Sequence, residues 1–373
     1  MRRETTAILL LVLTLLCIGL ITIYSVASVK TNGMSLFWRQ AVCVMAGLGV
    51  MLYLATFFDY HRFGEPLFFR GIVGLALLLL FAVLIPGIGV EVNGATRWIR
   101  LPVIHQFQPS EIAKFALILL LARKLAENRD RITSLLGGFL PAAFITGAFV
   151  LLVLMERDLG IPAVMGCVAF LMIFMGGARW FYVFGSAMAG SAIIVALIKT
   201  SPYRWQRLIS FLDPFSHRGD GGFHLIQSLA AFARGSYSGV GPGAGEQKLF
   251  YLPAAHTDFI FAVWGEEMGL LGTASVVAMF VAFLFLGMRI AKAAPDLFGS
   301  LLAAGITMLI SLQAAFNMGV TIGLLPTKGL TLPFVSYGGT AQIVFLAMAG
   351  ILMNIGLQAG AYYEVRQEFA TAH

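Results

Sequence analysis

Long apolar runs recur along the whole chain, separated by shorter polar stretches. About 20 apolar residues suffice for a helix to cross the hydrocarbon core of a bilayer. A spanning segment must satisfy its own backbone, which leaves helices or a closed barrel. These runs are longer and more continuous than the alternating strands of a barrel. The pattern therefore predicts ten membrane-spanning helices, at residues 6–27, 36–57, 68–86, 111–126, 134–155, 160–177, 180–199, 257–288, 297–323 and 334–358.

The composition agrees with this pattern. Of the 373 residues, 59% are hydrophobic and 12% are charged, whereas a soluble domain carries about 25% charged residues. We therefore expect an all-α polytopic membrane protein that forms one domain over residues 1–373. The three cysteines lie within predicted spans without metal-ligand spacing, so we expect them to pack as small apolar side chains.

The basic residues predict the orientation. Short loops at one end of the predicted spans are rich in arginine and lysine, and the positive-inside rule makes that end cytoplasmic. These residues are Arg62, Arg70, Arg123, Lys124, Arg129, Arg131, Arg179, Arg289 and Lys292. An even number of spans then places both termini in the cytoplasm. We expect the first span to be retained, because no small-residue cleavage site follows it.

The opposite end carries a long loop, residues 200–256. Arg204 and Arg207 lie near its start. Residues 223–232, which include Gln227, have the periodicity of a helix that lies in the membrane interface.

A glycine-rich run follows in the same loop and ends near Lys248. Successive backbone N–H groups in such a run can bind phosphate, although glycine-rich loops are more often merely flexible.

Asp258 follows His256 and Thr257 where this loop meets the eighth predicted span. A carboxylate at a membrane–water boundary is costly to keep, and is by default a functional candidate.

Residues 87–110 form a second polar body on the same side. Trp98 stands between Arg97 and Arg100. Such a group is typical of an interfacial anchor, or of an amphipathic segment at the mouth of a cavity, and both interpretations stay open. The dipeptide Asn93-Gly94 indicates a tight turn.

The fourth span begins with a polar group. Ser110 is a plausible N-cap. Glu111 and Lys114 are three residues apart and can pair on one helical face. They mark either a functional polar site or an ordinary helix start with a snorkelling lysine. Asp158, before the sixth span, is either another outer carboxylate or a cap.

A third polar body joins the last two spans and comprises Asn317-Met318-Gly319, residues 324–333 and residues 336–340. Two prolines and several glycines break the helix there. Irregular backbone at membrane depth is tolerated only in protein or beside a wet cavity. Lys328 in this segment either snorkels or contacts phosphate, and Ser336 lies nearby.

Residues 93–99, 248–261 and 323–339 together resemble the SEDS family, the shape, elongation, division and sporulation proteins of bacteria. The resemblance extends over essentially the whole chain. Residues 326–333 are more similar to the division branch of the family than to the elongation branch. The chain departs from the family pattern at residues 156–161, which leaves the role of Asp158 open, and at Thr340, where serine is usual.

The resemblance implies a peptidoglycan glycosyltransferase of the bacterial inner membrane. It would polymerise lipid II on the extracytoplasmic side and release undecaprenyl pyrophosphate. An α-linked donor that gives a β-linked chain needs one displacement and one general base, and the resemblance assigns that base to Asp258. Lys328, Lys114, Arg204 and Arg207 are candidates to bind the pyrophosphate, with or without a divalent cation such as Mg²⁺ or Mn²⁺.

We expect further residues of the polar bodies to bind substrate as well. These are Glu111, Trp98, Arg97, Asp158, His256, Thr257, Gln227, Lys248 and Ser336.

The resemblance also implies a class B penicillin-binding protein, a transpeptidase, as partner, together with other membrane proteins of cell division. Three alternatives stay open. A lipid II flippase would need access from both sides, whereas the unusual polar residues here gather on one. A non-catalytic division scaffold would not need Asp258. An elongation role is the alternative within the family.

Overall fold

The computed structural model describes residues 2–29, 33–92, 95–100, 107–157, 159–217, 222–248 and 254–371. Asp158 and the predicted turn at Asn93-Gly94 lie outside these ranges.

Each predicted span overlaps a helix. These helices are α1 (Arg2–Ala27), α2 (Gly33–Thr56), α3 (Pro66–Leu84), α4 (Pro109–Glu127), α5 (Leu140–Met155), α6 (Gly160–Met175), α7 (Trp180–Lys199), α10 (Ile260–Ala293), α11 (Leu297–Thr321) and α12 (Gly339–Thr371). In the described part of the chain, seven helices are long and apolar enough to cross a membrane, and α6 and α7 contain shorter apolar helices. A multi-pass helical membrane protein is thus confirmed, while the count of ten spans stays a prediction.

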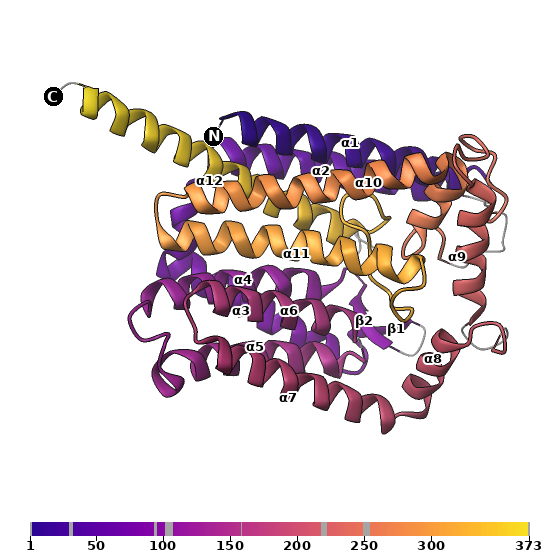
Figure 1. Ribbon diagram of the computed structural model, residues 1–373, viewed down its shortest axis with the longest axis horizontal. Coiled ribbons are helices and arrows are strands. Elements are labelled where there is room, and N and C mark those ends of the chain that lie inside the picture. The colour runs from indigo at the N-terminus through magenta and orange to yellow at the C-terminus, as the bar shows by residue number, and fades with distance from the viewer. Residues whose placement is uncertain are drawn as a thin grey trace.

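The central helix of the bundle is α11. It contacts α4, α6, α10 and α12, and most of its side chains are buried. The helices run along the long axis of the molecule (Figure 1). At one end α1 begins and α12 ends, and the opposite end carries α8 (Pro202–Leu212), α9 (Gly222–Gly235) and a β-hairpin. The two termini therefore lie at the same end, as expected.

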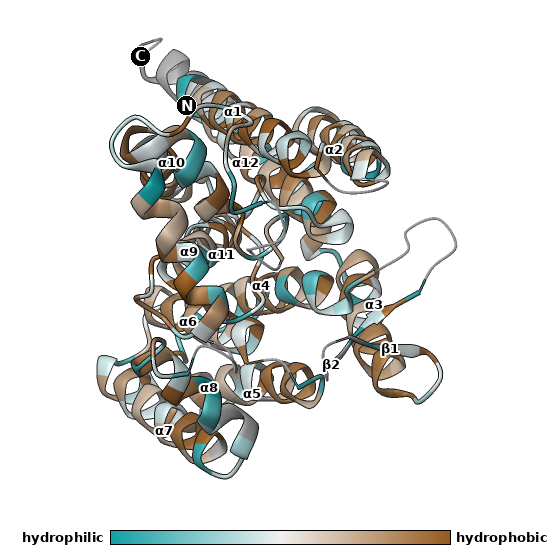
Figure 2. Cartoon of the chain, turned by 90° about the vertical axis from the view of Figure 1, so that its right-hand side faces the viewer, coloured by the Kyte–Doolittle hydropathy of each residue, from teal (hydrophilic) through white to brown (hydrophobic). Residues whose placement is uncertain are grey.

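The sides of the bundle are apolar. Figure 2 looks onto the end that carries α8 and α9, and hydrophobic residues cover much of the helices. Large side chains such as Phe57, Phe144 and Met188 are largely exposed. Soluble proteins rarely expose such extended apolar surface, so these sides fit contact with lipid.

The prediction of an all-α fold is wrong in one place. Strands β1 (Gly89–Val92) and β2 (Ala95–Ile99) pair antiparallel, with Val90 opposite Trp98. The reason is the local pattern, because Val90 and Val92 alternate with Glu91 at the period of a strand. Residues 89–92 and 95–99 therefore form a two-stranded sheet, and both interpretations of this region, an interfacial anchor or a segment at the mouth of a cavity, stay open.

Two local predictions meet different outcomes. The helix predicted at 223–232 is confirmed as part of α9. The N-cap at Ser110 is wrong, since α4 begins at Pro109 and Gln108 is its N-cap. Proline favours the first helical position because its fixed φ suits a helix and it has no N–H to leave unpaired.

Two short elements complete the path. A 3₁₀ helix η1 (Tyr60–Gly64) lies between α2 and α3, and a π-helical turn η2 (Leu135–Phe139) precedes α5. Both lie at the end of the bundle where the chain starts.

Candidate active site

The turn at residues 254–259 carries Asp258 immediately before α10. Three carbonyl groups of this turn accept hydrogen bonds from distant segments. Tyr337 N donates to His256 O (2.9 Å), Ser336 Oγ to Thr257 O (2.6 Å) and Asn317 Nδ2 to Asp258 O (2.8 Å). The backbone of Asp258 is therefore held between α11 and the segment that follows it.

That segment, residues 322–338, is irregular between α11 and α12, as predicted. Much of it is buried, and Ser336 Oγ accepts a hydrogen bond from Leu332 N (2.8 Å). Phe334 adopts the left-handed conformation (φ 65°), which is rare for a bulky residue. Its ring packs between Phe283 and Phe345, with centroids 6.1 Å from each. The packing of the Phe334 ring thus holds the backbone of this irregular segment in place.

Asp258 and Arg97 converge on Gly329. A methyl group placed on Gly329 would lie 3.3 Å from Asp258 Oδ2 and 3.4 Å from Arg97 Nη1. Arg97 comes from β2, and Lys328 is the residue directly before Gly329. The side chains of Asp258, Arg97 and Lys328 are half-buried. A carboxylate and a guanidinium from separate parts of the sequence therefore approach the same side of Gly329, where both side chains are partly shielded from solvent.

The predicted Glu111–Lys114 pair is confirmed. Lys114 Nζ lies 2.8 Å from Glu111 Oε2, donates to Gln313 Oε1 at 2.6 Å, and stands 4.9 Å from the ring centroid of Phe345. The lysine side chain is fully buried, so it does not snorkel to the interface. Contact with substrate would require this pair to open, and its predicted role in binding stays a prediction.

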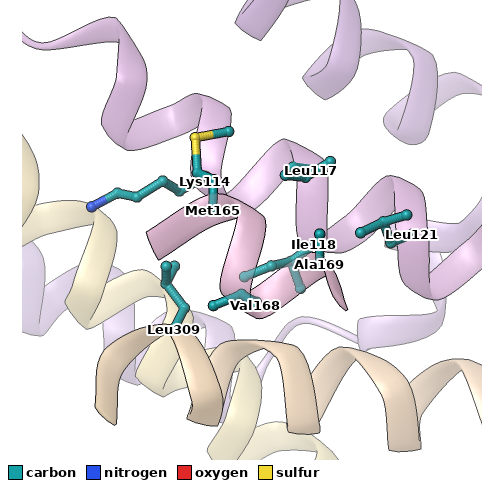
Figure 3. Close-up of a pocket in the computed structure, with 8 residues that line it drawn as sticks. All are labelled: Lys114, Leu117, Ile118, Leu121, Met165, Val168, Ala169 and Leu309. Atoms are coloured by element: carbon teal, nitrogen blue, oxygen red, sulfur yellow. The ribbon is translucent and has the colours of Figure 1, made fainter. Parts of the chain in front are cut away.

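Beside Lys114 lies a narrow gap between α4, α6 and α11 that is too small to hold a water molecule. Figure 3 shows that apart from Lys114 its wall is made of aliphatic and methionine side chains, and that the lysine nitrogen points away from them. An apolar wall of this kind does not suit a pyrophosphate.

Lys248 is held within the protein. Its ammonium donates to Ser25 Oγ (2.5 Å), Gly243 O (2.6 Å) and Glu267 Oε1 (2.7 Å). These three bonds use every proton that a lysine offers. The arrangement favours an anchoring role, and the expected contact with substrate stays a prediction.

The other predicted residues occupy several places. Ser336 is buried, and the His256 ring lies 5.6 Å from that of Tyr337. Trp98 is half-buried on β2, Gln227 is half-buried on α9, and Arg207 is exposed on α8. The side chain of Arg204 and all of Asp158 lie outside what the structure describes.

Sequence reasoning gave no role to two amides of α11. Asn317 donates to Leu330 O (2.5 Å) as well as to Asp258 O, and Gln313 donates to Thr331 O (3.0 Å). The available signal was the spacing, since polar residues four apart share one face of an otherwise apolar helix.

Among the residues that the structure describes, no three His, Cys, Asp or Glu side chains come together as a metal site. Because Mg²⁺ is usually held by one or two carboxylates together with substrate phosphates, the expected use of a divalent cation stays a prediction.

Comparison with known proteins identifies relatives over almost the whole length. The family model for cell cycle proteins of the FtsW, RodA and SpoVE type matches residues 5–360. A probable peptidoglycan glycosyltransferase FtsW from Geobacter sulfurreducens is 43% identical over 358 residues, which cover 95% of each chain. The stage V sporulation protein E of Bacillus subtilis is 39% identical, over 95% of this chain and 98% of its own.

A solved structure agrees with these relatives. One chain of a peptidoglycan synthase complex that coordinates polymerization and crosslinking superposes with a TM-score of 0.79. It is 30% identical, and the superposition covers 94% of this chain and 97% of that one. The chain therefore belongs to the FtsW/RodA/SpoVE family of cell cycle proteins.

Proposed function

We propose that this protein is a peptidoglycan glycosyltransferase that polymerises lipid II during cell division. The observation that carries the proposal is the convergence of the Asp258 carboxylate and the Arg97 guanidinium on Gly329, next to Lys328. The relative named as a probable peptidoglycan glycosyltransferase FtsW supports the same activity.

In this mechanism the hydroxyl of one sugar attacks the anomeric carbon of the donor. Asp258 accepts the hydroxyl proton as the new C–O bond forms, and the bond from carbon to the pyrophosphate oxygen breaks on the opposite face. One displacement inverts an α-linked donor to a β-linked product, so one general base is sufficient. The leaving group departs as undecaprenyl pyrophosphate.

The negative charge on the leaving pyrophosphate requires cations. Arg97 Nη1 approaches Gly329 at the position that Asp258 Oδ2 also approaches, and Lys328 directly precedes Gly329. Guanidinium and ammonium groups bind phosphate oxygens through charge-assisted hydrogen bonds, and in a half-buried place they are more effective than in water. We assign no step to a metal; a divalent cation, if used, would arrive on the pyrophosphate.

We also propose ten spans in the bacterial cytoplasmic membrane, with both termini in the cytoplasm and Asp258 on the outer side. The basic loops support this orientation, as does the position of both termini at the end opposite α8 and α9 (Figure 1). The related chain belongs to a complex of polymerization and crosslinking. On that basis we propose a class B penicillin-binding protein as partner.

The test is strand synthesis from lipid II by the purified protein, with and without a cognate transpeptidase. We compare wild type, Asp258→Asn and Asp213→Asn. Asp213 is an exposed carboxylate at the end of α8 whose oxygen accepts from Ser216 N (3.2 Å), a contact that asparagine retains. Wild type and the Asp213 variant should make β-linked strands, and Asp258→Asn should make none.

Two results would sink the proposal. Equal synthesis by Asp258→Asn would remove Asp258 as the base. No synthesis by the wild type with its partner present would favour a flippase or a scaffold, which lipid II transport in vesicles would then separate.

A further inference from the structure

Two buried amides of α11 face the irregular segment 322–338. Gln313 and Asn317 are four residues apart, which places them on one side of the helix. Both are 1% exposed. The glycosyl transfer proposed above does not use either side chain.

Asn317 ties the proposed base to the segment that carries Lys328. Its Nδ2 donates to Asp258 O at 2.8 Å and to Leu330 O at 2.5 Å. A side-chain amide has two N–H donors, and both serve here. The Asn317 amide thus fixes the separation between the backbone of Asp258 and that of Leu330, the residue after Gly329.

Gln313 lies one turn of α11 before Asn317, and Lys114 determines the orientation of its side-chain amide. An ammonium can only donate, so the glutamine must turn Oε1 toward Lys114, at 2.6 Å. Its Nε2 then faces Thr331, donating to the carbonyl at 3.0 Å and to Oγ1 at 3.2 Å. Glu111 in turn holds Lys114 in place, at 2.8 Å.

These contacts form a continuous row from α4 to the proposed base. Backbone carbonyls at membrane depth have no water to accept from, so the amides determine where this irregular backbone settles. We propose that Asn317 and Gln313 are positioning residues for glycosyl transfer, and that Lys114 acts through Gln313 without contacting the substrate. This inference rests on the proposed function, and it deepens the account of the same site.

Isosteric variants separate positioning from simple packing. In Asn317→Asp, the side chain has one proton to donate when protonated and none when ionised, so at least one of the two bonds to carbonyl oxygens is lost. Gln313→Glu keeps an oxygen for Lys114 but removes the donor to Thr331. Asn317→Ser retains one donor in a smaller side chain, and with Gln313→Glu it carries the test if Asn317→Asp does not fold.

The matched control is Gln342→Glu. The Gln342 amide is buried on α12 and donates to Phe334 O at 3.3 Å. The control therefore replaces an amide by a carboxyl that faces the same segment. Its acceptor, Phe334 O, belongs to a residue five positions after Gly329.

The measurements are kcat and KM for lipid II, with the partner present, and the thermal midpoint of each variant in detergent. A reacting group displaced by about 1 Å can cost about 100-fold in rate. We expect kcat per folded protein to fall about 10- to 100-fold in Asn317→Asp and Gln313→Glu, with KM unchanged. Asn317→Ser should be intermediate, and the Gln342 control should retain kcat within about twofold.

If the α11 variants lose no more kcat than the control, the amides only support the fold and the inference is overturned. A rise in KM with unchanged kcat would also overturn it, because that result indicates substrate binding. If the wild type itself makes no strands, the proposed function fails first and the positioning role falls with it.

Discussion

At the scale of residues, the charged side chains of Asp258 and Arg97 approach Gly329, a residue that has no side chain of its own. Gly329 is exposed, and it faces both Asp258 and Arg97. The absence of a Cβ leaves room between a carboxylate and a guanidinium that come from distant parts of the chain. That room is where we expect the attacking sugar hydroxyl, with the leaving pyrophosphate on the far side of the anomeric carbon.

Gly329→Ala should therefore lower the rate of strand synthesis without lowering stability. The new methyl would lie 3.3 Å from Asp258 Oδ2, closer than most Cβ contacts. The Asp258 carboxylate must therefore give way by a few tenths of an ångström, and such a shift of the proposed base should cost roughly tenfold in kcat.

The control for this variant is Gly338→Ala in the same segment. Its methyl would meet Ala341 and Thr331 at 3.5 and 3.6 Å, which are ordinary contacts. Equal rates for the two variants would contradict the role that we give to the space at Gly329.

The sequence indicated some of these residues better than others. Asp258 and Lys328 could be predicted because charge is rare at a membrane boundary and therefore conspicuous. Gln313 and Asn317 could not, because an amide inside a span has no recognisable task until its acceptors are known. Those acceptors are backbone carbonyls of a segment whose path no periodicity predicts.

At the scale of elements, α10 joins the proposed base to the glycine-rich run. The helix starts two residues after Asp258 and departs from helical geometry at Gly269 (φ 65°, ψ −160°). Just before this break, Glu266 accepts hydrogen bonds from Glu246 N and Gln247 N, and Glu267 pairs with Lys248. The glycine-rich run is thus fastened to α10, and the flexible loop that its composition suggested is largely fixed.

Lys248→Met should destabilise the protein strongly. It leaves Glu267 buried without its cation, and breaking one partner of a buried pair costs about 3–5 kcal/mol. Thermal unfolding in detergent measures the effect. Arg123→Met is the control, because Arg123 pairs with the half-exposed Glu127 four residues along α4, and such surface pairs contribute about 0–1 kcal/mol. Similar thermal midpoints for the two variants would contradict the anchoring role.

The sequence predicted the apolar helices correctly at this scale and missed the hairpin. Hydrophobic length is a strong signal for a span, because the membrane sets it. Strands β1 and β2 have only 4 and 5 residues. A pattern so short, in which a tryptophan follows an arginine, fits an interfacial anchor equally well.

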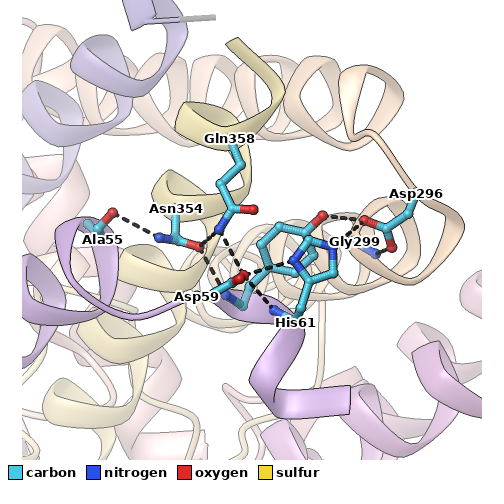
Figure 4. Close-up of polar contacts among 8 residues, drawn as sticks. Ala55, Asp59, His61, Asp296, Gly299, Asn354 and Gln358 are labelled. Carbon is cyan, nitrogen blue, oxygen red and sulfur yellow. Dashed lines mark hydrogen bonds and ion pairs between the residues drawn. The ribbon is translucent and has the colours of Figure 1, made fainter. Parts of the chain in front are cut away.

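At the scale of the whole molecule, a polar network holds together the end that carries the termini. His61 contacts Asp59 at 2.8 Å and Asp296 at 3.2 Å, and Gln358 of α12 donates to Asp59 at 2.9 Å (Figure 4). Tyr60 hydrogen-bonds Asp296, and Asn354 of α12 donates to the carbonyl of Ala55 at 3.1 Å. The network connects α2, α11 and α12 at the end opposite the candidate site.

This network predicts a pH dependence of stability. Burial would raise the pKa of Asp59, but hydrogen bonds from Gln358 and His61 outweigh it and hold that pKa below its usual value. The contribution of a carboxyl whose pKa is lowered by folding is present above its unfolded pKa, about 3.9, and is lost as pH falls through the folded value.

Asp59→Asn should therefore lower the free energy of unfolding at pH 7 by less than about 1 kcal/mol after solvent screening, which thermal unfolding in detergent shows as a small drop of the midpoint. The difference from wild type should shrink as the pH falls below about 3.9 and disappear once it has passed the lowered pKa of folded Asp59. Asp130→Asn, an exposed carboxylate in the α4–η2 connection, is the control. A difference that persists unchanged in acid would show that the ionised form of Asp59 has no stabilising role.

The central claim is that Asp258 removes a proton in the step that forms the glycosidic bond. The most direct test measures single-turnover glycosyl transfer and lipid II affinity in parallel, for wild type and Asp258→Asn in complex with the transpeptidase. Removal of a general base lowers the chemical rate by about 100- to 10,000-fold. We predict a loss in that range with lipid II affinity unchanged. A rate within a few fold of wild type, or a loss explained by weaker lipid II binding alone, would contradict the account.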